Sequence, residues 1–295
     1  MGSREGSKTN TSSRAMFGEF DTFERLVRVA HLYTWPVHNA VGERVVLDRT
    51  ADVWHGHFPG LGSVHVHPDG RIEVEPHRNR DSDAATPDEE EKCTALLYGW
   101  GEPLSLARRG FVLAHGIAAV APHAESGLLV SGDSHDTAIV VLGLASRGWK
   151  VIADGVVPLS FDTDAVRIHP RQAPILVSKR RLATTGFTGS PVRSETNVVS
   201  AEVPRDDRPL PLAAVVSVRI RRPDDQVLSA VTGHHRFDAA RKVIVGGVLV
   251  QPATTPRESM AQTLQMAASP SVNLRLDVES YESNLAELIT WWGSL

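Results

Sequence analysis

The chain of 295 residues contains a single cysteine, Cys93, and this scarcity excludes two classes of protein. One cysteine cannot form an internal disulfide, so the sequence does not describe a disulfide-stabilised secreted scaffold. It also cannot supply a tetrahedral cysteine zinc site. A reducing compartment is therefore favoured, and we expect a cytoplasmic protein.

The sequence also lacks long hydrophobic runs and an excess of basic residues. No apolar stretch approaches the ~18 residues of a transmembrane helix. Lys and Arg number 31 against 35 Asp and Glu, a net charge of -4, so no basic field points to nucleic acid. We therefore expect neither a membrane nor a nucleic acid as partner. With 41% hydrophobic and 22% charged residues, the composition is that of a globular protein with an ample core.

Polar composition and turn signals divide the chain into three parts. Residues 1–15 have no apolar core of the kind found in secretory signals, and we expect a disordered leader. Two alternating runs flank Pro68-Asp69-Gly70 within 63–76, which predicts a β-hairpin. A charged, turn-rich stretch over 76–92 follows. We therefore predict a β-rich N-terminal part over 16–92 and a larger domain over 93–295.

The larger domain begins with a strand–helix–strand pattern. Apolar runs at 111–121 and 127–132 precede a helical stretch from Thr137 to Ser146, which ends at Arg147-Gly148. A further strand is predicted over 149–159, and such a βαβ order implies a buried parallel pair. Residues 160–210 are weakly patterned, which is typical of a functional loop. Another strand over 212–220 and closing helices over 256–269 and 284–293 complete the domain.

The segment FVLAHGIAAVA … GLLVSGDSHDTAIVVLGLASRGWKVIADGVVPL, residues 111–159, resembles the P-loop core of the HPr serine kinase/phosphorylase family. It is most similar to the HPr-kinase-related proteins found beside peptide and natural-product biosynthesis genes. Four short motifs fall in the family's order with near-family spacing, namely His115-Gly116, Gly132-Asp133-Ser134, Arg147-Gly148 and Ala153-Asp154. The hairpin and WGEPLSLARRG (100–110) resemble the family's N-terminal part more weakly.

The resemblance implies a fold and a set of site residues. The fold is α/β, an HPr-kinase-like P-loop core with a mixed sheet flanked by helices, plus a smaller β-rich N-terminal part. It implies His115 and Asp154 as catalytic residues, and ATP with Mg²⁺ as cofactors of an active member. The phosphate-binding loop would comprise Gly132, Asp133, Ser134, His135, Asp136 and Thr137. A homo-oligomer is a further expectation of the resemblance.

The chain departs from the family at the residues that phosphoryl transfer needs most. In the pattern G-x-x-x-x-G-K-[ST] the lysine contacts the phosphates and the hydroxyl contacts Mg²⁺. Counted from Gly132, the last three positions are Thr137, Ala138 and Ile139. Counted back from Arg147-Gly148, Thr137 takes the lysine position and Ala138 the hydroxyl position. No lysine occurs between Lys92 and Lys150, and Asp154-Gly155 stands where the family has two aspartates.

These losses favour a pseudokinase, a kinase-like protein with a degenerate Walker A motif that binds, scaffolds or regulates a protein or peptide partner. Each lost electrostatic donor costs about 10²–10³ in rate. The alternative is an active ATP-dependent kinase of serine or a small molecule, using His115 and Asp154. A substitute cation would then be Arg147, Lys150, Lys179 or Arg181. A third hypothesis is a new activity that uses His115, His135 and Asp154.

Several other features can be interpreted either as functional or as purely structural. His135-Asp136 could bind a metal or provide an imidazolium in place of the lost lysine. The favoured interpretation is sequence drift in a loop that is no longer under catalytic constraint. His55, His57, His65 and His67 have the spacing of a zinc site, but a solvated hairpin face is favoured and no metal site is predicted. Lys179-Arg180-Arg181 could hold phosphate or an acidic peptide, and a solvated face is the more common meaning. His234-His235 is interpreted as structural, and Trp291-Trp292 is predicted to pack onto the domain.

Overall fold

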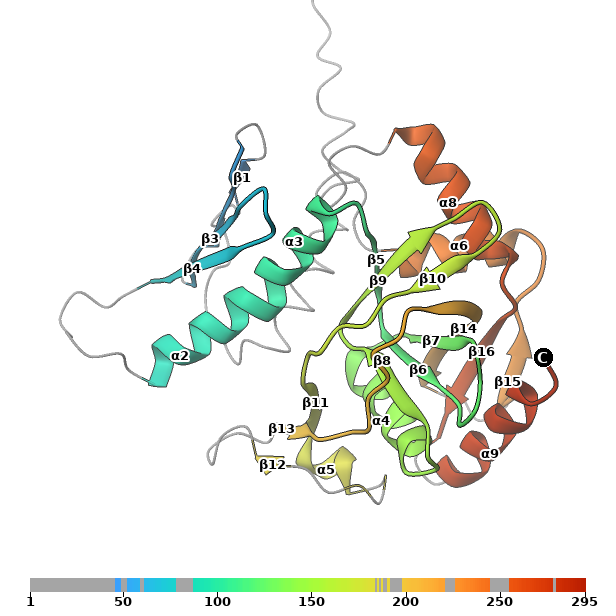
Figure 1. The fold of residues 1–295 in the computed structure, drawn as a ribbon. Helices are drawn as coiled ribbons and strands as arrows, with labels where there is room; N and C mark the ends of the chain where they lie inside the picture. The colour runs from blue at the N-terminus through green and yellow to red at the C-terminus, as the bar shows by residue number, and fades with distance from the viewer. Residues whose placement is uncertain are drawn as a thin grey trace, which may run out of the picture.

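The computed structural model shows a mixed α/β protein (Figure 1). It describes residues 46–48, 52–58, 61–77, 87–183, 185, 187, 190–191, 198–220, 226–244, 255–277 and 280–295. The predicted leader over 1–15 lies outside these residues. Among the described helices, none has the length and the apolar character that crossing a membrane requires.

The N-terminal part is a four-stranded antiparallel sheet in the order β1-β2-β3-β4. Its strands are β1 (Val46–Asp48), β2 (Trp54–Phe58), β3 (Gly62–Val66) and β4 (Ile72–Pro76). The hairpin predicted over 63–76 is confirmed, because β3 and β4 pair and the intervening turn is closed by the His67 amide donating to the Arg71 carbonyl at 2.9 Å. Alternation buries one face of this sheet and exposes the other.

A continuous helical run packs on the buried face of that sheet (Figure 1). It consists of α2 (Pro87–Thr94), the π-helix η1 (Ala95–Gly101) and α3 (Glu102–Arg108). Trp100 of η1 stacks on Phe58 with ring centroids 4.3 Å apart. Residue 92, the predicted boundary, lies inside α2, and packing onto the small sheet continues to Ala107. The division into two parts stays a prediction.

The larger part is built on a nine-stranded mixed sheet. Its main path has the order β5-β9-β10-β14-β7-β6-β8, and β16 extends it by pairing with both β14 and β15. The strands are β5 (Val112–His115), β6 (Ile117–Val120), β7 (Gly127–Ser131), β8 (Lys150–Ala153), β9 (Val156–Phe161), β10 (Val166–Ile168), β14 (Leu210–Ile220), β15 (Leu228–Ala230) and β16 (Ser271–Leu276). A separate three-stranded sheet contains β11 (Ile175–Ser178), β13 (Val198–Ala201) and β12 (Ser190–Pro191).

Helices cover both faces of the large sheet (Figure 1). On one face lie α4 (Ser134–Ala145) and α9 (Tyr281–Trp292), and on the other α6 (His234–Val243) and α8 (Pro256–Ala268). Successive side chains of a strand alternate between the two cores: Leu128 and Val130 of β7 face α4, whereas Leu129 faces the α6–α8 side.

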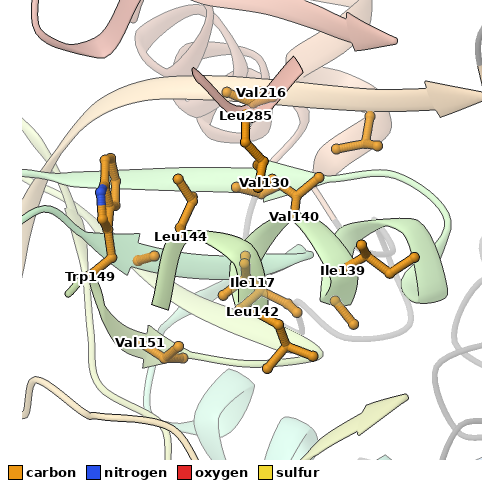
Figure 2. Packing of buried hydrophobic residues seen from close by; sticks show 14 of the residues in the cluster. Ile117, Val130, Ile139, Val140, Leu142, Leu144, Trp149, Val151, Val216 and Leu285 are labelled. Atoms are coloured by element: carbon orange, nitrogen blue, oxygen red, sulfur yellow. The ribbon is translucent and has the colours of Figure 1, made fainter. Parts of the chain in front are cut away.

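The core beneath α4 positions the end of β7 (Figure 2). Val140 and Leu144 of α4 pack with Val130 and Val216 from the strands and Leu285 from α9. The C-terminal tryptophans pack against the same core, as predicted, and Trp292 meets Trp149 with ring centroids 5.4 Å apart. Helix α4 is therefore fixed to the sheet along its length.

The sequence predicted that the strands before and after α4, β7 and β8, pair in parallel, and this prediction is wrong. β6 lies between β7 and β8 and is antiparallel to both, and the parallel neighbour of β7 is β14. β6 and β7 are joined by a short connection and pair as an antiparallel hairpin, so β6 occupies the position beside β7 that β8 would need for a parallel pair. The single strand predicted over 149–159 divides at Asp154-Gly155 into β8 and β9, where Gly155 has a φ of 73°.

Candidate functional site

Three separate chain segments come together at one end of the large sheet, where β7 and β8 end and β6 begins. In the β6 register Ile117 lies opposite Val130 of β7, and Ala118 lies opposite Ala153 of β8. The start of β6 therefore coincides with the ends of β7 and β8. His115 precedes β6, Gly132 follows β7 and Asp154 follows β8, so the antiparallel pairings bring these three predicted positions to the same edge.

Backbone contacts hold the His115 and Asp154 segments side by side. The Gly116 amide donates to the Gly155 carbonyl at 3.3 Å, and His115 lies opposite Val156 in the β5–β9 pairing. The His115 side chain is half-buried. An imidazole at the end of β5 and a carboxyl in the link between β8 and β9 are therefore placed on neighbouring segments of the backbone.

Close approach of neighbouring strands explains the glycine that follows β7. A Cβ on Gly132 would lie 2.6 Å from the Val218 carbonyl oxygen of β14. Gly116 is similar, since its Cβ would lie 2.2 Å from the Val130 carbonyl oxygen. Packing at this edge is therefore sufficient to require both glycines.

Only Gly132 and Asp133 separate β7 from α4. The Asp133 carbonyl accepts from the Thr137 amide at 2.8 Å and from the Thr137 hydroxyl, also at 2.8 Å. Helix α4 thus begins at Ser134, three residues before the predicted Thr137, and Ser134 and His135 belong to its first turn. The Thr137 side chain is buried, and Asp133 is exposed.

Asp136, in the first turn of α4, forms an ion pair with Arg181. Asp136 is only 6% exposed, and its Oδ1 accepts from Nη1 of Arg181. Arg181 comes from the short helix α5 (Lys179–Leu182), whose other cations, Lys179 and Arg180, are exposed. A carboxylate at a helix N-terminus is favoured by the helix dipole, and the arginine offsets its burial.

The four cations that could substitute for the lysine lie at different places in the fold. Only Arg181 of these four contacts the first turn of α4, through Asp136. Arg147 lies just beyond the C-terminal end of that helix, where it pairs with Glu282 and donates to the Gly143 carbonyl at 2.7 Å. Lys150 begins β8, at the edge opposite Asp154.

Asp154 is a buried residue, only 6% exposed, and the charges of Arg171 and Arg205 act on its carboxyl. Burial raises its pKa from 3.8 to about 7, and the charges of Arg171 and Arg205, together with a hydrogen bond from the Gly155 backbone, oppose that rise. Near neutral pH the group therefore exchanges between acid and carboxylate. This is the range in which a carboxyl can accept or donate a proton efficiently.

Arg171 is a residue of this region that the sequence does not reveal. It is 5% exposed and donates to the Asp154 carbonyl at 2.6 Å, to the Tyr98 carbonyl at 2.6 Å and to Oε2 of Glu102 at 2.9 Å. Arg205 in turn donates to the carbonyls of Arg171 and Ala173. The partners lie 17 to 73 residues away, so no local pattern could have marked Arg171.

The remaining histidines lie elsewhere. His55, His57, His65 and His67 belong to the N-terminal sheet and its turn, and His234-His235 begins α6 with ring centroids 4.0 Å apart. Across the described part of the chain, no group of three or more His, Cys, Asp or Glu side chains is arranged to hold a metal ion.

The turn does not fit a nucleoside triphosphate with Mg²⁺. Of the eight positions that a Walker A pattern would occupy from Gly132 to Ile139, only Gly132 and Asp133 precede the helix, and the other six lie within α4. The hydroxyl of Thr137 is committed to the Asp133 carbonyl. Ala138 and Ile139, the other positions that could carry a lysine or hydroxyl, are buried in the core beneath α4.

Comparison with known proteins gives a likeness of structure only. No family model matches the sequence. No curated protein matches it either. Among solved structures, the Hpr(Ser) kinase/phosphatase from Coxiella burnetii is similar over 62% of this chain and 99% of its own, with a TM-score of 0.31 and 9% identity. The likeness is weak, concerns the chain path alone and has no matching sequence relationship.

Proposed function

We propose that this chain is an HPr-kinase-like protein whose nucleotide site has degenerated, and that it acts by binding a protein or peptide partner. The observation that carries the proposal is the short, closed turn between β7 and α4. A phosphate cradle needs several backbone N–H groups turned toward one anion and a lysine above it. Here the carboxylates of Asp133 and Asp136 lie around the turn instead, and the nearby cation, Arg181, is paired with Asp136.

Calorimetric titration of the full chain with ATP, with and without Mg²⁺, tests the degenerate site. We expect no binding up to millimolar nucleotide, for the wild type and for Asp154→Asn alike. An established ATP-binding protein in the same buffer serves as the positive control. Micromolar binding that requires Mg²⁺ and is lost in Asp154→Asn would overturn the proposal.

The partner role requires a separate experiment. The family resemblance suggests a setting in peptide or natural-product biosynthesis, so candidate partners are the products of neighbouring genes. We expect one of them to co-elute with the purified chain as a stable complex in size-exclusion chromatography. Failure of every such pair to associate would contradict the partner role, whatever the nucleotide result.

A second candidate function is favoured by one specific observation. Asp154 titrates near neutral pH at the same end of the sheet as His115 and Gly132, which suits a proton acceptor for a substrate hydroxyl. The chain would then be an active phosphotransferase, with Arg181 as the substitute cation. Transfer of labelled phosphate that disappears in both Asp154→Asn and Arg181→Ala would support this function over the first.

A further inference from the structure

The exposed face of the N-terminal sheet has a polar pattern that the proposed function does not use. Alternation along β2 and β3 points Trp54, Phe58, Val64 and Val66 into the core. The outward positions hold instead a group of histidines and glutamates, His55, His57, His65, Glu73 and Glu75. Three adjacent strands thus place imidazole and carboxylate groups on one surface.

His55 and His65 form a direct cross-strand pair. They lie opposite each other in the β2–β3 register, and their Nδ1 atoms are 2.6 Å apart. The rings are nearly perpendicular, at 82°, with centroids 4.7 Å apart. So short a contact requires one nitrogen to carry a proton and the other to present its lone pair. When that proton moves to Nε2 of the same ring, both Nδ1 atoms present a lone pair to the space between the two rings.

A carboxylate stands behind one of these rings. Nε2 of His65 lies 3.5 Å from Oε2 of Glu75 on β4. A carboxylate at one ring nitrogen favours the proton there and leaves the other nitrogen as the electron-pair donor. Metal-binding histidines in proteins commonly have this second partner. Glu75 is thus within ion-pair distance of the ring nitrogen of His65 that points away from His55.

The neighbouring histidines have other partners. His67 lies 3.2 Å from Glu73 through Nε2, and its Nδ1 is 3.3 Å from Arg71, which also pairs with Glu73 at 2.6 Å. That cation makes the His67 side of the face a poor place for a metal ion. Nδ1 of His57 lies 3.2 Å from the Ser63 hydroxyl.

We propose that His55 and His65 bind a divalent transition-metal ion between their Nδ1 atoms, with water completing the coordination. Zinc–nitrogen bonds of about 2.0–2.1 Å in a tetrahedral site separate two nitrogens by about 3.3 Å. The pair must therefore open by several tenths of an ångström, and His55 is exposed and can turn. Imidazole suits zinc, copper and nickel. The converging nitrogens favour this site over the solvated face expected from sequence.

Calorimetry with ZnCl₂ on the full, untagged, chelator-treated chain tests the site. We expect a binding event that His55→Ala and His65→Ala each weaken by at least about tenfold. His57→Ala is the matched control, since it removes an exposed histidine from the same strand and face, and it should retain the affinity. Circular dichroism of each variant verifies that it is folded. Absence of zinc binding, or equal binding by wild type and His55→Ala, would overturn the proposal.

Glu75→Gln tests the orienting carboxylate. We expect weaker zinc binding, by up to about tenfold, with an unchanged urea unfolding midpoint in the absence of zinc. This combination separates an effect on His65 from a general loss of stability. The histidine pair lies on the N-terminal sheet and the proposed function rests on the turn between β7 and α4. A lack of zinc binding would therefore leave the proposed function unaffected.

Discussion

Buried charges decide the chemistry of this molecule at the scale of single residues. Asp154 and Arg171 are both almost fully buried, and Arg171 donates to the backbone carbonyl of Asp154 at 2.6 Å. Its guanidinium also pairs with Glu102. Asp154 therefore keeps a carboxyl whose charge the surroundings offset only in part, and it titrates near neutral pH.

The raised pKa of Asp154 predicts a pH-dependent difference in stability between the wild type and Asp154→Asn. Between the unfolded pKa of 3.8 and the folded pKa of about 7, the folded protein retains a proton that the unfolded chain has released. This contribution is fully present below pH ~4 and is lost as the pH rises through about 7. Asparagine makes no such contribution.

Urea unfolding of both proteins at about pH 5 and about pH 8 measures this difference. Asp154→Asn should gain roughly 2 kcal/mol relative to the wild type at the higher pH, since each pKa unit corresponds to about 1.4 kcal/mol. A constant difference between the two proteins at both pH values would show that Asp154 does not titrate in this range.

Removal of Arg171 should be costly. Arg171→Met removes the guanidinium that donates to the Glu102 carboxylate and to the carbonyls of Asp154 and Tyr98, and we expect a loss of about 3–5 kcal/mol in the free energy of unfolding. The control is Arg167→Met, which breaks an exposed pair with Asp162 and should cost less than about 1 kcal/mol. Equal losses in chemical denaturation would contradict the structural role of Arg171.

At the scale of elements, the turn between β7 and α4 decides what the sheet edge can bind. The helix core fixes α4 against β7 and β14, and Thr137 closes the turn by bonding to Asp133. Gly132 allows β7 and β14 to approach at that point. The packing of α4 against β7 and β14 therefore determines the conformation and the length of this turn.

Gly132→Ala should disrupt that packing. The new Cβ would meet the Val218 carbonyl oxygen at 2.6 Å, so backbone must shift, and we expect a loss of about 2–3 kcal/mol. Gly293→Ala is the control, because its Cβ would meet the nearest atoms at an ordinary 3.6 Å. Thermal unfolding measures both, and an unchanged midpoint for Gly132→Ala would refute the close approach.

Elements with a strong local pattern could be predicted from sequence, whereas their pairing could not. The 63–76 hairpin and helix α8 are both present, since a turn motif and a capping Thr255 specify them locally. Thr255 accepts from the Glu258 amide and Glu258 accepts from the Thr255 amide. The place of β6 between β7 and β8 has no such signal, because it depends on pairing between strands that lie on either side of helix α4 in the chain.

At the scale of the whole molecule, one buried arginine connects the helical run of the N-terminal part to the large sheet. Arg171 reaches Glu102 of α3, Tyr98 of η1 and the end of β8 simultaneously. Apolar packing adds to this link, since Leu113 and Val156 of the large sheet belong to the core of the small one. The small sheet with its helices is therefore joined to the large sheet both by the hydrogen bonds of Arg171 and by apolar packing.

Glu102→Gln should loosen this connection without unfolding the large sheet. The Arg171 guanidinium would lose its carboxylate, and we expect amide hydrogen exchange over 54–76 and 95–108 to become about tenfold faster. Exchange in β7 and β14, which are held by the core beneath α4, should stay unchanged and serves as the internal control. Equal acceleration everywhere would indicate global destabilisation instead.

The sequence by itself determined which local elements form and which chemical groups the turn after β7 can offer. The absence of lysine between 92 and 150, the single cysteine and the hairpin motif depend only on residue order. Tertiary structure alone decided which groups meet. Arg181 lies against Asp136 from 45 positions away, Arg171 beneath Asp154, and His55 against His65 across two strands. Such contacts depend on strand order and packing, which link residues that no short-range pattern connects.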